Sequence, residues 1–349
     1  MGNYERRDIG VVLQQVALGE TVSLEEYFPE IGKSHAPITD DYGGFVDVAG
    51  KDRRGGGCWS GHKRLLPGEG SKLPRVSSSA GRETGVANRD AMLRITTFNA
   101  NGIRAATRKG FFTWLRRLSP DVLCIQETKA QEHQLPPEAL DLDEYSYAFV
   151  DAQKKGYSGV AIYAKRAPDA IVRGLGMPDV DAEGRYVRFN WGDLSIASLY
   201  IPSGTSGPLR QAVKDSFLER FLAPLAEMQS DGRRYIICGD YNVAHKDIDT
   251  FDPVRNSGIT GFLPHERAWM DTVVDEIGWV DAFREVDREG KRYTWWSNWP
   301  GAYERNLGWR IDYQLVTPNL ASFVRSASIY RDERFSDHAP LTITYDLTL

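Results

Sequence analysis

The sequence predicts an α/β fold in which β-sheets pack against each other and helices lie outside them. Strand-like runs outnumber helical ones, several runs such as YIIC and VLCI are apolar on both faces, and helical spacing is confined to a few segments. A strand that is apolar on both faces needs a layer of structure on each side. We therefore expect packed sheets in one domain that spans residues 92–349.

The strand candidates are short runs rich in β-branched and aromatic residues. The last of them alternates apolar and polar residues between Leu341 and Leu347, as a half-buried strand does. In chain order the candidates are LRITTFN, DVLCIQET, SGVAIYA, RYVRFNW, LSIASLYI, RYIICGDYN, RIDYQLVT, SASIYR and PLTITYDL.

Three segments show the spacing of amphipathic helices. The first is KGFFTWLRRL, whose apolar side chains share one face. The second runs from Pro208 to Met228, and we expect Pro224 to kink or end it because proline has no backbone N–H. A third helix is predicted from His265 to Glu276.

Residues 1–91 differ in composition from the rest of the chain. They hold clusters such as GKDRRGGGC and RVSSSAGRETG with no sustained period, and nothing there predicts a buried core. Strand-like runs start at Leu93, directly after Met92. We therefore predict that residues 1–91 are a disordered extension or reflect an upstream start codon. A regulatory or interaction tail is the alternative that the sequence leaves open.

The composition, 41% hydrophobic and 26% charged, is that of a soluble globular protein. No apolar run approaches the ~20 residues that a membrane span needs. The N-terminus lacks the pattern of a secretory signal. Three cysteines argue against a disulfide framework, and Cys124 and Cys238 lie in apolar runs typical of buried thiols in a reducing compartment. These features predict a cytoplasmic protein, and the absence of a heptad pattern favours a monomer.

The net charge of −5 argues mildly against a protein that coats nucleic acid non-specifically, because such proteins are usually basic. It does not exclude an enzyme whose acidic residues bind metal and whose basic residues line one face.

Most predicted strands end in a polar residue that can bind metal or phosphate. Asp240 and Asn242 lie two residues apart at one strand end, so their side chains face the same way. Asp312 stands inside an apolar strand, and Asp337 and His338 precede the last strand. The other polar strand ends are Asn99, Asn101, Glu127 and Tyr200.

Each of these residues also has a purely structural interpretation. Asn99 could cap a turn, Asn242 could form an Asx-turn, and Glu127 could be a solvated strand end. Asp312 is harder to dismiss, because an acid between apolar neighbours is costly to bury unless it is paired, and a histidine is a natural partner. One shared cleft at the edge of the sheets explains the polar strand ends better than six separate structural roles.

The residue types in this predicted cleft favour a hard cation. The sequence has no cysteine–histidine cluster of the kind that binds zinc and no Walker-type loop. Carboxylate and amide oxygens suit Mg²⁺, with Mn²⁺ as a substitute, and such a cation with few protein ligands usually accompanies phosphate chemistry.

Seven motifs occur in order across nearly the whole of residues 93–349: FNANGIR, QETK, SLYIPSG, GDYNVA, FLPHERAWMD, GWRIDY and SDHAP. Together they resemble the exonuclease III family of apurinic/apyrimidinic (AP) endonucleases, in the wider endonuclease–exonuclease–phosphatase superfamily. FLPHERAWMD and GWRIDY point to the DNA-repair branch. The resemblance implies a four-layered α/β sandwich, with two packed mixed β-sheets flanked by helices.

The resemblance also implies roles for the site residues. Glu127 would bind Mg²⁺, with Asn99 and Asp337 completing the surroundings of the metal through water. Asp240 would orient or deprotonate the attacking water, a task that needs a carboxylate within hydrogen-bond reach. Asn242 would position that water or a phosphate oxygen.

Tyr200 would donate a hydrogen bond to the scissile phosphate. Asp312 would hold His338, which would donate to a non-bridging oxygen and stabilise the transition state. Whether His338 donates or acts as the base stays open at this point.

Contacts to DNA follow from the same resemblance. Arg185 and Asn101 would contact the substrate, and Trp295 and Trp309 would line a pocket for a base-less sugar flipped out of the helix. Five basic residues could be phosphate contacts or simply solvated: Arg104, Arg108, Lys109, Lys154 and Lys155.

The sequence therefore predicts a Mg²⁺-dependent DNA-repair phosphodiesterase that cuts the backbone 5′ to abasic sites and has 3′-phosphodiesterase and 3′–5′ exonuclease activity. Its partner would be double-stranded DNA with abasic sites or blocked 3′ ends, with no membrane involved. One alternative keeps the fold but acts on RNA, an inositol phosphate or a lipid. A second alternative is an inactive DNA-binding scaffold, which the presence of all the acids and His338 disfavours.

Overall fold

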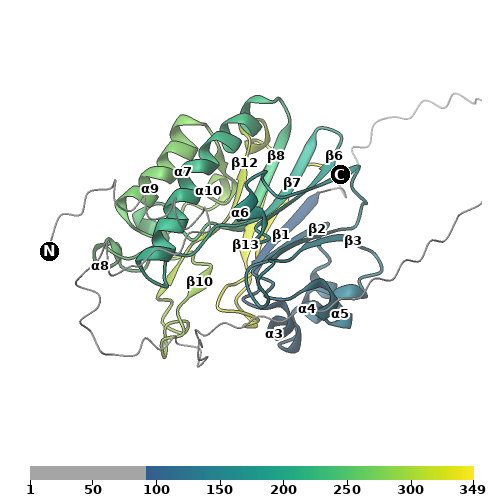
Figure 1. Cartoon of the computed structure of the whole chain (residues 1–349), viewed down its shortest axis with the longest axis horizontal. Helices are drawn as coiled ribbons and strands as arrows, with labels where there is room; N and C mark the ends of the chain where they lie inside the picture. The colour runs from purple at the N-terminus through teal and green to yellow at the C-terminus, as the bar shows by residue number, and fades with distance from the viewer. Residues whose placement is uncertain (1–91) are drawn as a thin grey trace, which may run out of the picture. The chain divides into compact units, whose positions relative to one another are not determined.

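The computed structural model describes residues 92–349, in which two six-stranded sheets pack face to face (Figure 1). The first sheet has the strand order β13-β14-β1-β2-β4-β3. Its strands are β1 (Leu93–Asn99), β2 (Val122–Gln126), β3 (Ser146–Val150), β4 (Val160–Ala164), β13 (Val324–Ile329) and β14 (Leu341–Tyr345).

The second sheet has the strand order β5-β6-β7-β8-β12-β9. Its strands are β5 (Ala170–Arg173), β6 (Tyr186–Trp191), β7 (Leu194–Tyr200), β8 (Arg234–Asp240), β9 (Val280–Asp281) and β12 (Asp312–Val316). A separate two-stranded ribbon joins β10 (Trp295–Trp296) to β11 (Gly308–Trp309).

Both large sheets are mixed. The pairs β1–β2 and β7–β8 are parallel, and the other neighbouring strands of the two sheets run antiparallel. Parallel neighbours need a crossover connection. Helix α7 (Pro208–Ser230) supplies that crossover between β7 and β8, and two short helices supply it between β1 and β2: α3 (Ile103–Arg108) and α4 (Phe111–Leu118).

Helices cover the outer face of each sheet. Phe111 and Leu115 of α4 pack with Phe98 of β1, and Phe217 of α7 packs with Ile237 of β8. Figure 1 shows α4 and α7 on opposite outer sides of the two sheets. The other helical segments are η2 (Glu132–Gln134), α5 (Pro137–Leu140), α6 (Pro178–Asp181), η3 (Asp247–Asp249), α8 (Pro253–Asn256), α9 (Pro264–Asp271), η4 (Thr272–Glu276), α10 (Ala282–Val286) and α11 (Pro318–Ala321). The predicted four-layered α/β sandwich is therefore confirmed.

Strand periodicity divides the core into layers. Ile95 of β1 and Ile236 and Cys238 of β8 belong to the cluster between the two sheets, whereas Phe98 and Ile237 point outward to the helices. Because side chains alternate along a strand, residues 99, 240 and 312 also face the space between the sheets. The apolar layer between the sheets thus ends in the predicted polar residues.

Helix α7 spans the predicted segment from Pro208 to Met228. Pro224 lies inside it and does not end it, since the helix continues to Ser230. Phe221 and Leu225 on either side of the proline are both fully buried, so packing of the flanking turns holds the helix in place. On the same helix Lys214 is fully buried, whereas the neighbouring Val213 is exposed.

Nine strands were predicted, and each corresponds to a strand in the structure, with ends that differ by a few residues. Two further strands of four or more residues, β3 and β5, were not predicted. Both lie at sheet edges, where partly exposed strands carry a weaker apolar pattern. The predictions for residues 1–91 fall outside the described residues.

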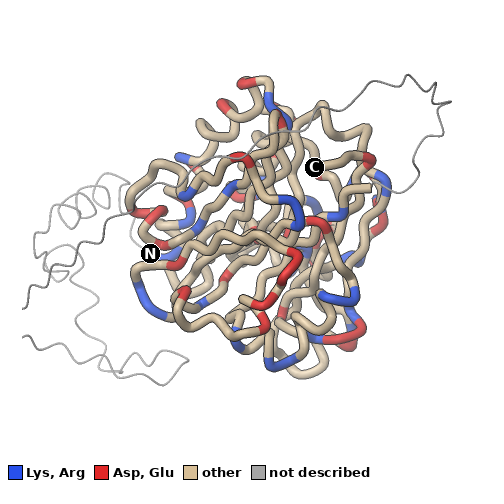
Figure 2. The backbone as a smooth tube through the Cα atoms, turned by 90° about the vertical axis from the view of Figure 1, so that its right-hand side faces the viewer, with Lys and Arg blue, Asp and Glu red and all other residues tan. Residues whose placement is uncertain are grey.

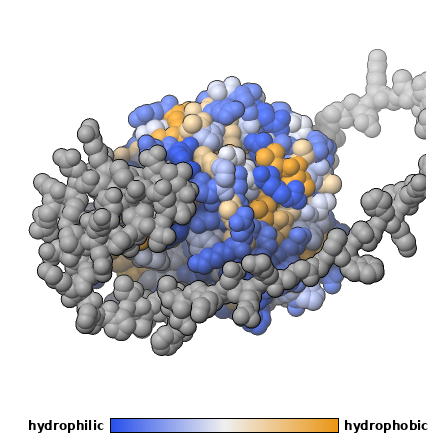
Figure 3. Space-filling model, in the orientation of Figure 1, coloured by the Kyte–Doolittle hydropathy of each residue, from blue (hydrophilic) through white to orange (hydrophobic). Residues whose placement is uncertain are grey.

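No helix among residues 92–349 has both the length and the apolar character to cross a membrane. Along the described backbone in Figure 2, the positions of Lys and Arg are interspersed with those of Asp and Glu. The face in Figure 3 is mostly hydrophilic, broken by small hydrophobic areas.

Candidate active site

Strand register places three of the predicted site residues at one level of the second sheet. Tyr200 of β7 pairs with Asp240 of β8, which in turn pairs with Asp312 of β12. Asn99 reaches the same level from the first sheet and donates from its Nδ2 to Asp240 Oδ2 at 2.8 Å. Asp240 therefore lies at the junction between the two sheets.

Asp240 is almost completely buried and accepts hydrogen bonds at both oxygens. The Asn242 backbone N–H donates to Oδ1 at 2.8 Å, in a turn that places Asn242 at φ 52°. Burial raises the pKa of Asp240 to about 7, with the nearby Asp312 carboxylate acting in the same direction and His338 opposing it. Near neutral pH this carboxyl group can therefore accept a proton.

His338 is held by Asp312, as predicted. Its Nδ1 lies 2.9 Å from Asp312 Oδ2, and its Nε2 lies 3.8 Å from Asp240 Oδ2. Burial alone would lower the pKa of His338, but the carboxylates of Asp312, Asp240 and Asp337 outweigh it and raise the pKa to about 10. The imidazole is thus cationic at neutral pH.

Tyr200 is backed by a buried arginine. Arg185 donates from Nη1 to the Tyr200 carbonyl at 3.0 Å, and its guanidinium carbon lies 4.8 Å from the centre of the Tyr200 ring. Burial raises the pKa of Tyr200 well above its usual value, so the phenol stays a neutral donor. Arg185 is 1% exposed and also binds Glu183 and Tyr157, so its predicted contact with the substrate stays a prediction.

A second group of polar side chains lies on turns beside this cluster. Asn101 donates from Nδ2 to Asp337 Oδ1 at 3.0 Å, and the Lys129 ammonium lies 2.6 Å from Asn101 Oδ1 and 2.9 Å from Glu127 Oε1. Asn101, Glu127 and Lys129 all adopt positive φ, of 41°, 52° and 47°. Such backbone conformations are costly outside glycine and concentrate at functional sites.

Lys129 was missed by the sequence analysis, although it stands in the QETK motif. The only feature of the sequence that pointed to Lys129 was its position two residues after Glu127. Its ammonium shows that the oxygens of Glu127 and Asn101 together attract a cation. The oxygen-only donors of Glu127, Asn101 and Asp337 fit a hard divalent ion.

Asn99 belongs to the buried cluster more than to this acidic group. Its Nδ2 is bound to Asp240, and its Oδ1 accepts the Asn101 backbone N–H at 2.9 Å. The set Asp240, Asp312 and His338 also brings ligand-type atoms within 4.8 Å of one another. The raised pKa of His338 disfavours metal binding by these three residues, because a histidine ligand must be neutral.

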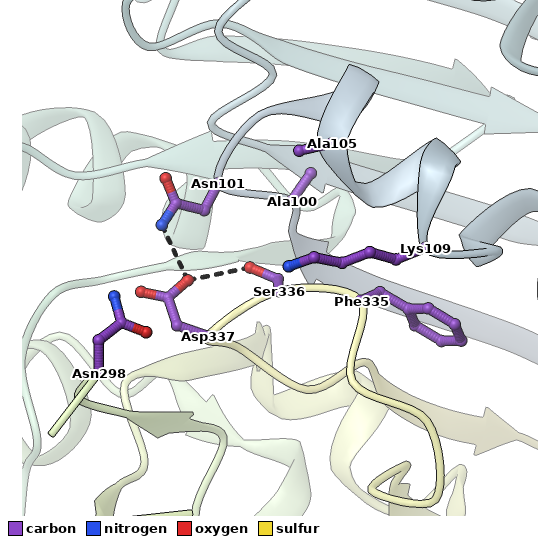
Figure 4. A pocket seen from close by; sticks show the side chains of 8 residues that line it. All are labelled: Ala100, Asn101, Ala105, Lys109, Asn298, Phe335, Ser336 and Asp337. Atoms are coloured by element: carbon purple, nitrogen blue, oxygen red, sulfur yellow. Dashed lines mark hydrogen bonds between the residues drawn. The ribbon is translucent and has the colours of Figure 1, made fainter. Parts of the chain in front are cut away.

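A cavity of about 130 Å³ opens beside Asp337 (Figure 4). Ser336 and Asn101 both donate to Asp337 Oδ1, and Lys109 and Asn298 lie around the same space. The contacts with Asn101, Ser336 and Trp295, together with the cationic His338, outweigh burial and hold the pKa of Asp337 below its usual value. The cavity therefore combines an ionised carboxylate with a lysine.

The predicted aromatic residues lie next to the polar cluster. The Trp295 and Trp309 rings are 6.1 Å apart and edge to face, and Trp295 Nε1 donates to Asp337 Oδ2 at 3.2 Å. Trp295 also pairs with His338 through an isolated β-bridge. The five basic residues predicted as phosphate contacts or solvated side chains are all exposed: Arg104, Arg108, Lys109, Lys154 and Lys155.

The protein class follows from a family comparison. Residues 96–338 match the Endonuclease/Exonuclease/phosphatase family, and the chain belongs to this family. Within it, the chain is similar to an exodeoxyribonuclease of Bacillus subtilis, with 36% identity over 73% of this chain and 100% of the relative. It is also similar to the DNA repair nuclease APEX1 of Danio rerio, with 34% identity over 73% of this chain and 83% of the relative.

Solved structures place the chain more narrowly. An AP endonuclease from Archaeoglobus fulgidus has a TM-score of 0.67 and 31% identity, over 73% of this chain and 100% of that one. A 3′–5′ exonuclease from Neisseria meningitidis has a TM-score of 0.67 and 27% identity, also over 73% of this chain and 100% of that one. The chain is thus a nuclease hydrolase of the exonuclease III type.

Proposed function

We propose that the protein is a DNA-repair AP endonuclease, which hydrolyses the DNA backbone 5′ to an abasic site and trims blocked 3′ ends. The observation that carries the proposal is the buried constellation of Asp240, Asp312 and His338, because it places a proton acceptor beside a cationic donor. The names of the similar proteins, an exodeoxyribonuclease and an AP endonuclease, support the substrate class.

Asp240 acts as the general base in this proposal. A pKa of about 7 lets it take a proton from water near neutral pH, and the hydrogen bonds from Asn99 and Asn242 fix the direction of its oxygens. Asn242 contributes its side-chain amide, which also donates to the Ile201 carbonyl at 2.9 Å, to position the water or a phosphate oxygen.

His338 acts as a cationic hydrogen-bond donor and not as the base. Its raised pKa keeps both ring nitrogens protonated, Asp312 occupies Nδ1, and Nε2 remains for a non-bridging phosphate oxygen. Tyr200, neutral because of burial, supplies a second donor. Donors fixed before the substrate arrives stabilise the charge that develops in the transition state.

Glu127 and Asp337 would hold Mg²⁺, with Asn101 and Asn99 at its border and Mn²⁺ as a substitute. When bound, the ion takes up charge on the phosphate and leaving oxygen. The Lys129 ammonium must yield part of its contact with Glu127 for this to happen. Asn101 connects the Glu127 side of this proposed metal site to the Asp337 side, because it contacts both Lys129 and Asp337.

Trp295 and Trp309 would line a pocket for the base-less sugar. Their edge-to-face packing and the hydrogen bond from Trp295 to Asp337 support a position for this pocket beside the acidic group. A pocket closed by two indoles admits a deoxyribose and excludes a nucleotide by size. Residues 92–349 would form the catalytic domain, a monomer, with residues 1–91 as an extension.

The test is cleavage of a labelled duplex that carries one stable abasic analogue. We expect one nick 5′ to the lesion with Mg²⁺, none with EDTA, and none from Glu127→Gln with Mg²⁺. Glu132→Gln, at an exposed acid that follows Glu127 in the chain, is the matched control and should cleave normally. A second arm with a blocked 3′ end tests trimming. Folded protein that binds Mg²⁺ but leaves both duplexes intact would disprove the proposal.

The same assay addresses the first 91 residues. The full chain and a chain that begins at Met92 should cleave at equal rates if the extension is dispensable for catalysis. A slower shortened chain would assign residues 1–91 a part in substrate binding or folding.

A further inference from the structure

A completely buried lysine lies behind the turn that carries Asn242. Lys214, on α7, is 0% exposed, and its Nζ donates to the Asn242 carbonyl at 2.7 Å. The same ammonium lies 2.5 Å from Glu266 Oε1 on α9, also 0% exposed. No chemistry has so far been assigned to either residue, although Glu266 stands in the FLPHERAWMD motif.

Glu266 fixes a second segment with its other oxygen. Its Oε2 accepts the backbone N–H groups of Gly261 at 2.6 Å and Leu263 at 3.0 Å. Gln211 of α7 donates to Oε1 at 3.0 Å. One buried carboxylate therefore joins α7 and α9 to the loop just before α9.

That loop contacts both the turn after β8 and the proposed sugar pocket. The Gly261 carbonyl accepts the Ala244 N–H at 2.7 Å. Gly261 has φ +91°, and a Cβ added there would lie 3.1 Å from both the Asn242 carbonyl oxygen and a ring carbon of Trp309. The backbone at Gly261 thus fills the space between the turn after β8 and an aromatic residue of the proposed sugar pocket.

A buried ion pair needs a reason, because apolar residues of similar size often stabilise a core as well or better. Burial lowers the pKa of Lys214, and Glu266 is the main opposing influence. What an apolar side chain could not supply is a donor for the Asn242 carbonyl. That carbonyl belongs to the residue whose N–H orients Asp240 and whose φ of 52° needs support from its surroundings.

We propose that Lys214 and Glu266 are positioning residues for phosphodiester hydrolysis. The pair holds the Asp240–Asn242 turn and the Gly261 loop in the geometry that the reaction requires, without touching the substrate. The inference rests on the proposed roles of Asp240, Asn242 and Trp309. A misplaced base slows the chemical step more than it weakens DNA binding, so the effect should fall on kcat.

Two variants test the pair. Lys214→Met removes the donor and keeps the length of the side chain, but it leaves the Glu266 carboxylate buried without its partner. Lys214→Met/Glu266→Gln removes both charges and avoids that penalty. Arg220→Met is the matched control, because Arg220 lies on the same helix and forms an exposed ion pair with Asp179 instead.

Two measurements are made on the full chain. Steady-state cleavage of the abasic duplex should show kcat lower by about 10- to 100-fold and KM within about threefold in both pair variants. Amide hydrogen exchange should be at least about tenfold faster at Asn242 and Ala244, whereas core strands such as β2 keep their protection. Arg220→Met should match the wild type in both.

The outcomes separate this inference from the proposed function. Unchanged exchange at Asn242 and Ala244 in a folded pair variant, or an unchanged kcat, would overturn the positioning role. Loss of the native fold in both pair variants would assign the pair to stability alone and overturn it equally. If wild-type protein leaves the abasic duplex intact, the proposed function fails, and the exchange data still decide whether the pair positions the turn.

Discussion

Two clusters of buried charge meet on one short stretch of chain, GWRIDY, and they differ in kind. Arg310 binds Asp249 and Asp281, each at 2.8 Å, and Asp249 also binds Arg284 at 2.5 Å. Two residues later, Asp312 binds His338 and pairs with Asp240 on the neighbouring strand β8. The first group pairs two guanidiniums with two carboxylates. The second gathers two carboxylates around one imidazole.

The pKa values of the carboxyl groups show the consequence. Burial works against the charge of both Asp249 and Asp240. At Asp249 the guanidiniums of Arg310 and Arg284 outweigh burial and lower the pKa to about 2. At Asp240 burial and the Asp312 carboxylate prevail over His338, and the pKa rises to about 7. We infer that the arginine cluster stabilises the fold, whereas the histidine cluster holds reactive groups at the expense of stability.

The largest expected effect comes from Asp240→Asn. Cleavage of the abasic duplex should slow by about 10³-fold, because the proposed general base is lost while the shape of the side chain is kept. Stability should not fall. A raised carboxyl pKa means that ionisation of Asp240 destabilises the fold progressively as pH rises from about 4 to about 7, so the melting temperature at pH 8 should equal or exceed that of the wild type. Single-turnover rates and thermal unfolding check both statements.

The opposite pattern is expected for Asp249→Asn. Removing one partner from a buried ion-pair cluster typically costs about 3 kcal/mol, while kcat should stay within about threefold because Asp249 touches no proposed reacting group. Urea unfolding measures the first quantity and cleavage at saturating DNA the second. A stable but inactive variant would show that the arginine cluster serves catalysis after all.

Asp312→Asn should change the pH profile. With Asp240 titrating near 7 and His338 near 10, activity should rise through neutral pH and fall in the alkaline range. Asp312 is the largest influence that raises the pKa of His338, so its loss should move the alkaline limb toward neutral pH. Rates between pH 5 and pH 11 measure this shift. An unmoved alkaline limb would mean that His338 is not the group that titrates there.

Acid should weaken the arginine cluster in a defined window. Because the pKa of Asp249 in the folded protein is about 2, below its ordinary value of 3.8, its stabilisation is complete above about pH 4 and is lost as pH falls toward 2. The shift corresponds to about 2 kcal/mol. The stability difference between wild type and Asp249→Asn should therefore shrink over this range in urea titrations. A constant difference would assign the variant's loss to packing.

The smallest effect is expected at the surface. Arg325 and Asp346 form an ion pair at 2.7 Å with both side chains about half exposed. Such pairs contribute less than about 1 kcal/mol because water screens them and the side chains lose freedom. Arg325→Ala should leave the melting temperature and the cleavage rate close to wild type. A large fall in the melting temperature would show that the exposure of an ion pair does not predict its contribution to stability in this fold.

Much of the fold could be predicted from the sequence, because its central strands are short, apolar runs with clear ends. β3 and β5 were missed because both are edge strands: β3 mixes exposed and buried positions, and β5 has no buried position. Of the two outcomes expected at Pro224, an end to the helix does not occur, because packing of Phe221 and Leu225 overrides the local preference of proline.

The site could be predicted as a set of residues but not as a geometry. Two-residue spacing predicted that Asp240 and Asn242 lie together, and the Asn242 backbone N–H donates to Asp240. The acid inside an apolar strand predicted a histidine partner for Asp312, and that partner is His338. Their roles in the reaction stay predictions. Lys129, Lys214 and Glu266 were missed as neighbours of the site, because their contacts depend on turns at positive φ and on helix packing that no local pattern encodes.

The most direct test of the account places Asp240→Asn and Asp249→Asn side by side, with single-turnover cleavage and unfolding free energy measured on the same preparations. We predict that Asp240→Asn loses about 10³-fold in rate and no stability, while Asp249→Asn loses about 3 kcal/mol and almost no rate. If both variants lost rate and stability in the same proportion, the two clusters would form one structural unit, and the division between a stabilising and a reactive cluster would be wrong.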